Sequence, residues 1–211
     1  RAKAVIAATG SDFANLGVDG EEEFRGRGVS NCATCDGAFF LDETVAVVGG
    51  GDSALDEALS LTTFVSKVIM LVRGDEFSGQ AHIQERVRDN AKIEIRFGQT
   101  VTAVLGGDTG VNGVRVKDAG TGEESTLDVA GVFIFVGTDP RSSYLSGFVG
   151  LDGGGHVETD VPMCTPSPGL YAVGDIRSGS ARQLVTSAGD GAPAAFARHR
   201  SRDSPPCPPY R

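Results

Sequence analysis

The stretch TVAVVGGGDSALDEALSLTTFVSKVIMLV, residues 44–72, decides the fold of this chain. It begins with the β-branched run Thr44–Val48, turns at three consecutive glycines and ends with the apolar run Lys67–Val72. Between these runs, side chains recur at the spacing of one helical face, at Leu55, Ala58, Leu59 and Thr62. Strand, glycine turn, helix and strand make a βαβ unit, whose two strands are expected to run parallel.

The turn in this unit has the pattern G-x-G-x-x-A of a dinucleotide-binding site. Gly49 permits a tight turn, Gly51 lets a pyrophosphate approach the backbone, and Ala54 allows the helix to pack closely on the strand. The N-terminus of the helix attracts phosphate. We therefore predict a dinucleotide site at Gly49, Gly51, Asp52, Ser53 and Ala54. The alternative is a glycine-rich turn with no ligand.

Further elements follow the βαβ unit. A helix is predicted over Ala81–Asn90, and Val132–Val136 is fully apolar, which is typical of a central parallel strand. Four short runs between them suggest a small antiparallel meander: Ile93–Phe97, Thr100–Leu105, Gly113–Val116 and Ser125–Val129. The predicted fold class is α/β, a Rossmann-like three-layer domain with a meander.

The flanking segments predict part of a second domain. Lys3–Gly10 is predicted to be a short buried strand and Ser11–Gly28 a connecting segment, and Gly137–Pro140 is a candidate domain boundary. A strand over Leu170–Val173 and a helix from about Arg182 come next. Two features mark the C-terminal part: Pro193 falls inside that helix, and Ser201–Arg211 is predicted to be disordered.

The pair Cys32 and Cys35 forms a C-x-x-C motif followed by Asp36. Two cysteines at this spacing can close a small disulfide ring, and the adjacent carboxyl group could deliver or take the proton that thiol–disulfide exchange requires. Half of a zinc site, or coincidence, is the alternative. The other candidate ligands lie scattered without paired spacing, at Cys164, Cys207, His82, His156 and His199, so we favour the redox interpretation.

Two weaker patterns concern the binding of the nicotinamide nucleotide and of a flavin. Arg73, at the end of the second strand, favours NADP over NAD, although Asp75 and Glu76 stand close by and an arginine there is often only a solvated charge. Gly174-Asp175 after a buried strand can bind a flavin ribityl hydroxyl. Taken alone, an ordinary turn is the preferred interpretation of that dipeptide.

Composition limits the possible functions. The formal net charge of −9 argues against binding of nucleic acid, and no apolar run approaches the roughly 18 residues of a membrane helix. No signal peptide is recognisable, so a reducing, cytoplasmic location is expected. The chain opens with Arg1 rather than methionine, which suggests a fragment of a longer protein.

Taken in order, five stretches closely resemble the low-molecular-weight thioredoxin reductases: GEEEFRGRGVSNCATCDGAFF, VAVVGGGDSALDEAL, GVFIFVGTDP, GLYAVGDI and RQLVTSAGDG. The resemblance extends over residues 3–195 and implies two nucleotide-binding domains, one inserted in the other. Residues 15–138 would be the NAD(P)H domain with the C-x-x-C centre. Residues 1–14 and 139–200 would be part of the FAD domain.

The resemblance also implies roles for individual residues. Electrons would pass from NADPH through FAD to the Cys32–Cys35 disulfide and on to thioredoxin or a thioredoxin-like protein. Cys35 would face the flavin, Cys32 would attack the partner's disulfide, and Asp36 would donate the proton. The remaining cofactor contacts would be Gly137, Gly174, Asp175, Arg182 and Gln183. A homodimer is implied for the full-length form.

The chain departs from this family in two functional features. The N-terminal half of the FAD site is missing, so the isolated polypeptide is expected to hold FAD poorly. The family's cationic His-Arg-Arg motif, with a further arginine four positions on, is replaced by Val72-Arg73-Gly74 and Ser78. NADH or another donor is therefore an alternative to NADPH, as are a non-catalytic nucleotide-binding fragment and a related C-x-x-C flavoprotein that oxidises dithiols.

Overall fold

The computed structural model of this chain describes residues 2–200, and only the backbone of the last three of these. It divides into two compact units. The inserted unit is Phe13–Gly137, and the terminal unit combines Arg1–Asp12 with Thr138–Arg211. The segment predicted to be disordered, residues 201–211, lies outside the described residues.

A five-stranded parallel sheet forms the centre of the inserted unit, in the order β3-β10-β4-β5-β6. Its strands are β3 (Val29–Ser30), β4 (Thr44–Val48), β5 (Lys67–Val72), β6 (Ile93–Phe97) and β10 (Gly131–Ile134). The three inner strands β4, β5 and β10 are almost wholly apolar and buried because both faces of the sheet are covered, as is usual for parallel sheets.

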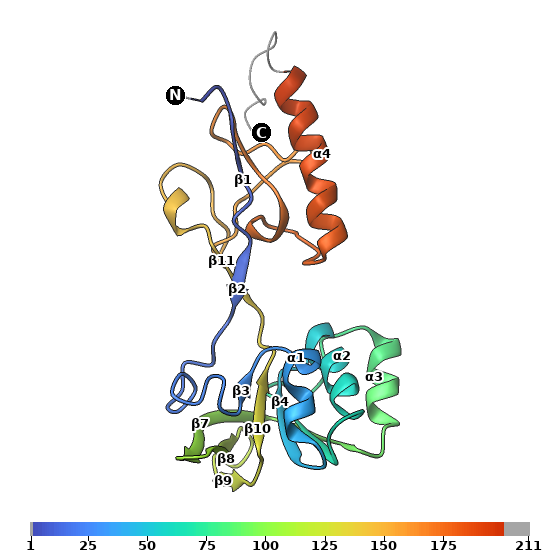
Figure 1. The fold of residues 1–211 in the computed structure, drawn as a ribbon. Helices are drawn as coiled ribbons and strands as arrows, with labels where there is room; N and C mark the ends of the chain where they lie inside the picture. The colour runs from blue at the N-terminus through green and yellow to red at the C-terminus, as the bar shows by residue number, and fades with distance from the viewer. Residues whose placement is uncertain (1, 201–211) are drawn as a thin grey trace. The chain divides into compact units, whose positions relative to one another are not determined.

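Helices cover one face of this sheet and a meander covers the other, as Figure 1 shows. The helical layer contains α1 (Ala33–Asp36), the short 3-10 helix η1 (Gly37–Phe40), α2 (Asp52–Leu61) and α3 (Ala81–Arg88). The meander is antiparallel and contains β7 (Gln99–Gly107), β8 (Gly110–Asp118) and β9 (Glu124–Leu127). Alternate residues of β4 divide between the two cores: Val45 and Val47 pack under α2, while Ala46 and Val48 pack under the meander.

These elements confirm the predicted three-layer α/β fold class. β4 pairs in parallel with β5, and β10 lies centrally between β3 and β4. The assignment of Ile93–Phe97 to the meander was wrong, because this run is β6, paired in parallel with β5 at the edge of the main sheet. All five of its residues are half-buried, as is usual for an edge strand. Its sequence therefore lacks the continuous apolar run that marks a central strand of a parallel sheet.

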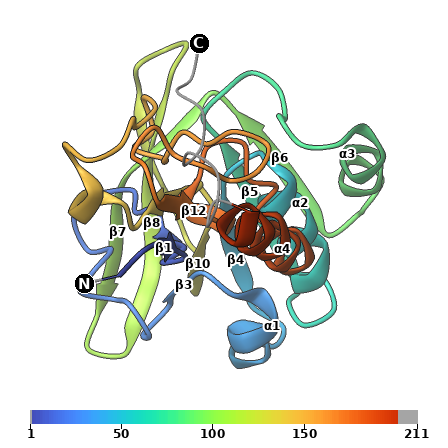
Figure 2. The same ribbon diagram turned by 90° about the horizontal axis from the view of Figure 1, so that it is seen from above.

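The terminal unit contains two small two-stranded sheets and one long helix. β1 (Val5–Ala7) pairs in parallel with β12 (Leu170–Ala172), and β2 (Ser11–Phe13) pairs with β11 (Thr138–Pro140). Helix α4 (Leu184–Arg200) lies beside β12 (Figure 2), and its Ala194 packs with Tyr171 and Val173. Two 3-10 helices complete the unit: η2 (Ser143–Leu145) and η3 (Gly174–Ile176).

Two expectations for these flanking segments need correction. The strand in Lys3–Gly10 is not buried, since Val5 is 53% exposed and Ile6 43%; within the described residues β12 is the one strand that pairs with β1. The segment Ser11–Gly28 is not wholly a connection, because it supplies β2. The predicted last helix is confirmed: it begins at Leu184, close to Arg182, and includes Pro193. Across residues 2–200, no helix is long and apolar enough to cross a membrane.

Candidate functional site

A cleft of about 640 Å³ opens at the carboxyl ends of β4, β5 and β10 in the inserted unit. The chain adds β5 on one side of β4 and returns to place β10 on the other, so the cleft lies where the strand order reverses. Open α/β sheets bind their ligands at this point, and the volume is in the range of a cofactor site. Its walls are residues 14–16, 48–51, 71–74, 76, 78, 99–101 and 135–137.

Gly49 turns the chain out of β4 at the floor of this cleft. Its φ is +137°, and a Cβ placed there would lie 2.2 Å from the carbonyl oxygen of Phe135 and 3.1 Å from the Cβ of Ala54. Only glycine fits this conformation and this space. At Gly51, by contrast, a Cβ would meet nothing closer than the Ser78 hydroxyl at 3.7 Å, so this glycine leaves open room for a ligand.

Helix α2 begins at the wall of the cleft with its first turn uncapped by a side chain. Backbone N–H groups at a helix N-terminus attract phosphate. Asp52 in this turn is exposed, and its Oδ1 accepts a hydrogen bond of 2.7 Å from the amide of Gln80. Ser53 is exposed and Ala54 is buried against the turn. The glycines and the helix start therefore fit the pyrophosphate of a dinucleotide.

The far end of the cleft carries mixed charge. Arg73 and Glu76 both line it, together with Ser78 and Gly74. Within the described residues Arg73 forms no ion pair. The predicted residues Gly49, Gly51, Arg73 and Gly137 are thus brought to one cavity, whereas Asp52, Ser53 and Ala54 are not among the residues that line it.

Cys32 and Cys35 form a disulfide, with their Cα atoms 5.3 Å apart. Cys32 caps helix α1, and its Sγ accepts a hydrogen bond of 3.2 Å from the Cys35 amide. Cys35 is exposed in this chain and Cys32 is half-buried. In the part of the chain that the structure describes, no three His, Cys, Asp or Glu side chains gather as metal ligands would.

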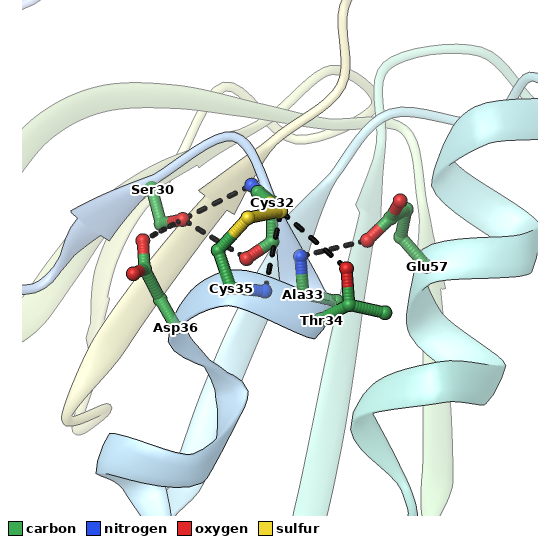
Figure 3. Close-up of a disulfide and its surroundings, with 7 residues drawn as sticks. All are labelled: Ser30, Cys32, Ala33, Thr34, Cys35, Asp36 and Glu57. Atoms are coloured by element: carbon green, nitrogen blue, oxygen red, sulfur yellow. Dashed lines mark hydrogen bonds between the residues drawn. A yellow bond between two sulfur atoms is a disulfide. The ribbon is translucent and has the colours of Figure 1, made fainter.

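Asp36 lies beside the disulfide and is held by Ser30. The Ser30 hydroxyl donates to Asp36 Oδ2 at 2.6 Å and accepts from the Cys32 amide at 3.0 Å, as Figure 3 shows. Ser30 is only 7% exposed, so its hydroxyl has a defined position. The hydrogen bond from this hydroxyl holds the Asp36 carboxyl group at the edge of the redox pair. The sequence analysis did not identify Ser30.

Glu57 of α2 reaches the same turn from the other side (Figure 3). Its Oε2 accepts a hydrogen bond of 2.7 Å from the amide of Ala33. This residue was also missed, because it is 24 positions away from its partner in the sequence and nothing in the helix pattern distinguishes it from a solvated charge.

A further hydrogen-bonded chain leads from the redox turn to the cleft wall. The Asn31 side chain donates to the carbonyl oxygen of Ile134 at 2.8 Å and accepts from Arg25 at 2.9 Å. Arg25 also donates to Asn15, which lines the cleft, at 2.8 Å. The segment before Cys32 is therefore tied to the end of β10.

The residues that match flavin contacts lie in the terminal unit. Gly174 has a φ of +73° directly after β12, and Asp175 follows it. Asp175 Oδ1 accepts hydrogen bonds from the hydroxyls of Ser180 and Ser187, the latter in the first turn of α4. Arg182 and Gln183 are exposed and come immediately before that helix. The fold thus brings these four predicted positions to the start of α4.

A largely buried ion pair holds the Gly174 turn. Arg177 Nε donates to Asp190 Oδ2 at 2.6 Å, and its second nitrogen donates to Oδ1 at 2.8 Å. Asp190 Oδ2 also accepts from the Gly174 amide at 3.0 Å. The hydrogen bond from Arg177 is the main cause that lowers the pKa of the Asp190 carboxyl group, which burial partly opposes. Sequence reasoning did not identify this pair either.

The model of the family described as pyridine nucleotide-disulphide oxidoreductase matches residues 1–192. The chain belongs to this family. The family's description names a pyridine nucleotide and a disulfide, and the inserted unit contains the Cys32–Cys35 disulfide and a glycine-lined cleft. The resemblance predicted from the motifs is confirmed.

Within this family, the similar proteins are thioredoxin reductases. The chain is 46% identical over 201 residues to the thioredoxin reductase of Mycolicibacterium smegmatis, which covers 95% of this chain and 64% of that protein. It is 45% identical to a bifunctional thioredoxin reductase/thioredoxin of Mycobacterium leprae, covering 95% and 44% respectively. The crystal structure of Lactococcus lactis thioredoxin reductase matches with a TM-score of 0.87 at 41% identity, covering 93% and 65%. The chain spans about two thirds or less of each of these proteins.

Proposed function

We propose that this chain is the larger part of a thioredoxin-disulfide reductase. The observation that carries the proposal is the Cys32–Cys35 disulfide, with Asp36 hydrogen-bonded beside it, in the same unit as a glycine-lined dinucleotide cleft. The cleft of the inserted unit would hold NADPH, the source of hydride, and FAD would supply the two-electron chemistry by which the Cys32–Cys35 disulfide is reduced. A cytoplasmic location and a homodimeric full-length form belong to the same proposal.

The nicotinamide nucleotide would be bound by the walls of the cleft. Gly51 leaves room for the pyrophosphate, and the uncapped N-terminus of α2 directs its amides at the phosphates. Gly137, with a φ of +117°, lines the cleft after β10. Arg73 would be the one cation of the cleft wall to meet a 2′-phosphate, so we propose NADPH bound with modest affinity and NADH as a competing donor.

FAD would be bound in part by the terminal unit. Asp175 would accept a ribityl hydroxyl, and the hydrogen bonds that Ser180 and Ser187 donate to its Oδ1 support this role because they orient the carboxylate. Gln183 and Arg182 stand before the first turn of α4, where backbone amides and a guanidinium would meet the flavin. The residues present account for only part of an FAD site.

The redox pair would act on a disulfide of thioredoxin or of a thioredoxin-like protein. Cys32 attacks the partner's disulfide and Cys35 resolves the mixed disulfide that forms, which restores the intramolecular bond. Asp36, held by Ser30, moves the proton between sulfur and solvent. The thioredoxin fused to the Mycobacterium leprae relative supports a partner of this class.

The proposal is tested by the visible absorption spectrum of the purified chain supplied with FAD, before and after anaerobic addition of NADPH. A flavin band that bleaches, followed by reduction of added thioredoxin, supports it. Cys35→Ser should stop thioredoxin reduction and leave bleaching intact. Retained turnover in that variant, or failure of the chain to bind NADPH, contradicts the proposal; absence of bound FAD alone is the expected result for a chain that carries only part of that site.

A further inference from the structure

Glu57 is a charged group at the redox centre that the proposed mechanism does not use. Its carboxylate Oε2 lies 2.7 Å from the amide nitrogen of Ala33, the residue between Cys32 and the rest of the short helix α1. Ala33 is fully buried, so the position of its amide is closely defined. Figure 3 shows Glu57 directed from α2 into this turn.

The other hydrogen bonds of the turn are local. The Cys32 amide donates to Ser30, the Cys35 amide to Cys32 Sγ, and the Asp36 amide to the Cys32 carbonyl oxygen. Ser30, at the end of β3, is only a few residues from its partners in this turn, whereas Glu57 ties the turn to helix α2, 24 positions further along the chain. A hydrogen bond from an amide to a carboxylate is about twice as strong as one between neutral groups.

The two ionisable side chains bonded to this turn are both acidic. Asp36 and Glu57 contact it, and within the described residues neither forms an ion pair with a lysine, arginine or histidine. Cysteine thiolates are stabilised by nearby positive charge and opposed by negative charge. The charge of Glu57 therefore acts against a thiolate in the reduced pair.

We propose that Glu57 is a positioning residue of the redox centre with two roles. Its carboxylate fixes the first turn of the C-x-x-C segment through the Ala33 amide, and its charge limits the thiolate population after reduction. The reduction itself breaks the Sγ–Sγ bond of Cys32 and Cys35 and takes up two electrons and two protons. In the test these come from dithiothreitol, which is oxidised to its cyclic disulfide.

The electrostatic role is tested with Glu57→Gln, which keeps an oxygen acceptor and removes the charge. After reduction with dithiothreitol, the rate of iodoacetamide alkylation at Cys32 and Cys35 is followed against pH by peptide mass spectrometry. One carboxylate near the turn is worth roughly 0.5–1 pH unit in the midpoint of this profile. Alkylation below the midpoint should therefore be about three to ten times faster in the variant.

Asp56→Asn is the matched control, because Asp56 is an exposed acid on the same helix. Its alkylation profile should coincide with that of the unsubstituted chain. A Glu57→Gln profile that also coincides with it would overturn the electrostatic role. An equal shift in both variants would do the same, since it would reflect net charge and not contact with the turn.

The structural role is tested by hydrogen exchange of the Ala33 amide in the oxidised chain. Exchange should be about tenfold or more faster in Glu57→Ala and only slightly faster in Glu57→Gln, which retains the acceptor. Unchanged exchange in Glu57→Ala would overturn this role. Far-UV circular dichroism and air formation of the Cys32–Cys35 disulfide check that each variant folds.

This inference deepens the proposed function, because it concerns the cysteine pair on which that function rests. Its test uses neither flavin nor nucleotide. A negative result for Glu57 would therefore leave the reductase proposal in place, and failure of the reductase assay would leave the Glu57 measurements valid.

Discussion

Substitution of Gly49 by alanine should separate the structural glycine of the cleft from the ligand-binding one. The new Cβ would lie 2.2 Å from the Phe135 carbonyl oxygen, and the residue would have to keep a φ of +137°. The backbone strain costs about 1–3 kcal/mol, and relieving the overlap by moving β4 from β10 costs about as much again. We expect the free energy of unfolding to fall by roughly 2–6 kcal/mol.

Gly51→Ala is the matched control, with a φ of −89° and 3.7 Å of clearance to the nearest heavy atom. It should unfold within about 1 kcal/mol of the unsubstituted chain, because alanine is only a poorer N-cap than glycine. Its methyl group would instead occupy the space for the pyrophosphate and weaken NADPH binding by about tenfold or more. Urea denaturation followed by circular dichroism gives the first quantity, and nucleotide fluorescence titration gives the second. Stability of Gly49→Ala within about 0.5 kcal/mol of the original would refute the steric argument.

Three further outcomes are expected. Asp190→Asn should lower the free energy of unfolding at pH 7 by about 2–4 kcal/mol, measured with urea, because it leaves the partly buried guanidinium of Arg177 without its carboxylate partner. The pKa of Asp190 is lower in the folded chain than in the unfolded chain. The ionised carboxylate therefore stabilises the fold above the unfolded pKa of about 3.9, and this stabilisation is lost as the pH falls through the folded pKa. The free energy of unfolding of Asp190→Asn should not show this loss in acid. Ser30→Ala should slow thioredoxin reduction by about threefold to tenfold in flavin-loaded enzyme, since Asp36 loses its donor, and an unchanged turnover would argue against the proton role. Gly74→Arg should raise the affinity for NADPH relative to NADH by about tenfold, and equal ratios in titrations of both forms would contradict the proposed ribose end of the cleft.

The central strands of the inserted unit were predictable because a strand that is covered on both faces of the sheet has a continuous apolar sequence. Thr44–Val48 and Lys67–Val72 match the observed strands residue for residue. Ile93–Phe97 was misassigned because an edge strand alternates charged and apolar residues, as a meander strand does, and its partner β5 is distant in the sequence. Local pattern indicates a strand but not which neighbour it will have.

The candidate site was predictable where its chemistry is local. The C-x-x-C spacing and the glycine turn each depend on residues within a few positions of one another, so motif reasoning identified both. Ser30, Glu57 and the Arg177–Asp190 pair act through hydrogen bonds between separate elements. A serine, a glutamate or an arginine that does this is indistinguishable in the sequence from one that faces solvent.

The two points at which the chain enters and leaves the inserted unit are neighbours. The Ala14 amide donates to the Gly137 carbonyl oxygen at 3.0 Å, and just outside it β2 pairs with β11. Such an arrangement makes the unit a cassette whose ends are already joined by main-chain hydrogen bonds. If the inserted unit were removed, a short peptide could link Asp12 directly to Thr138 and leave the terminal unit as one continuous chain. The inserted unit could therefore be exchanged as a whole, in evolution or by design.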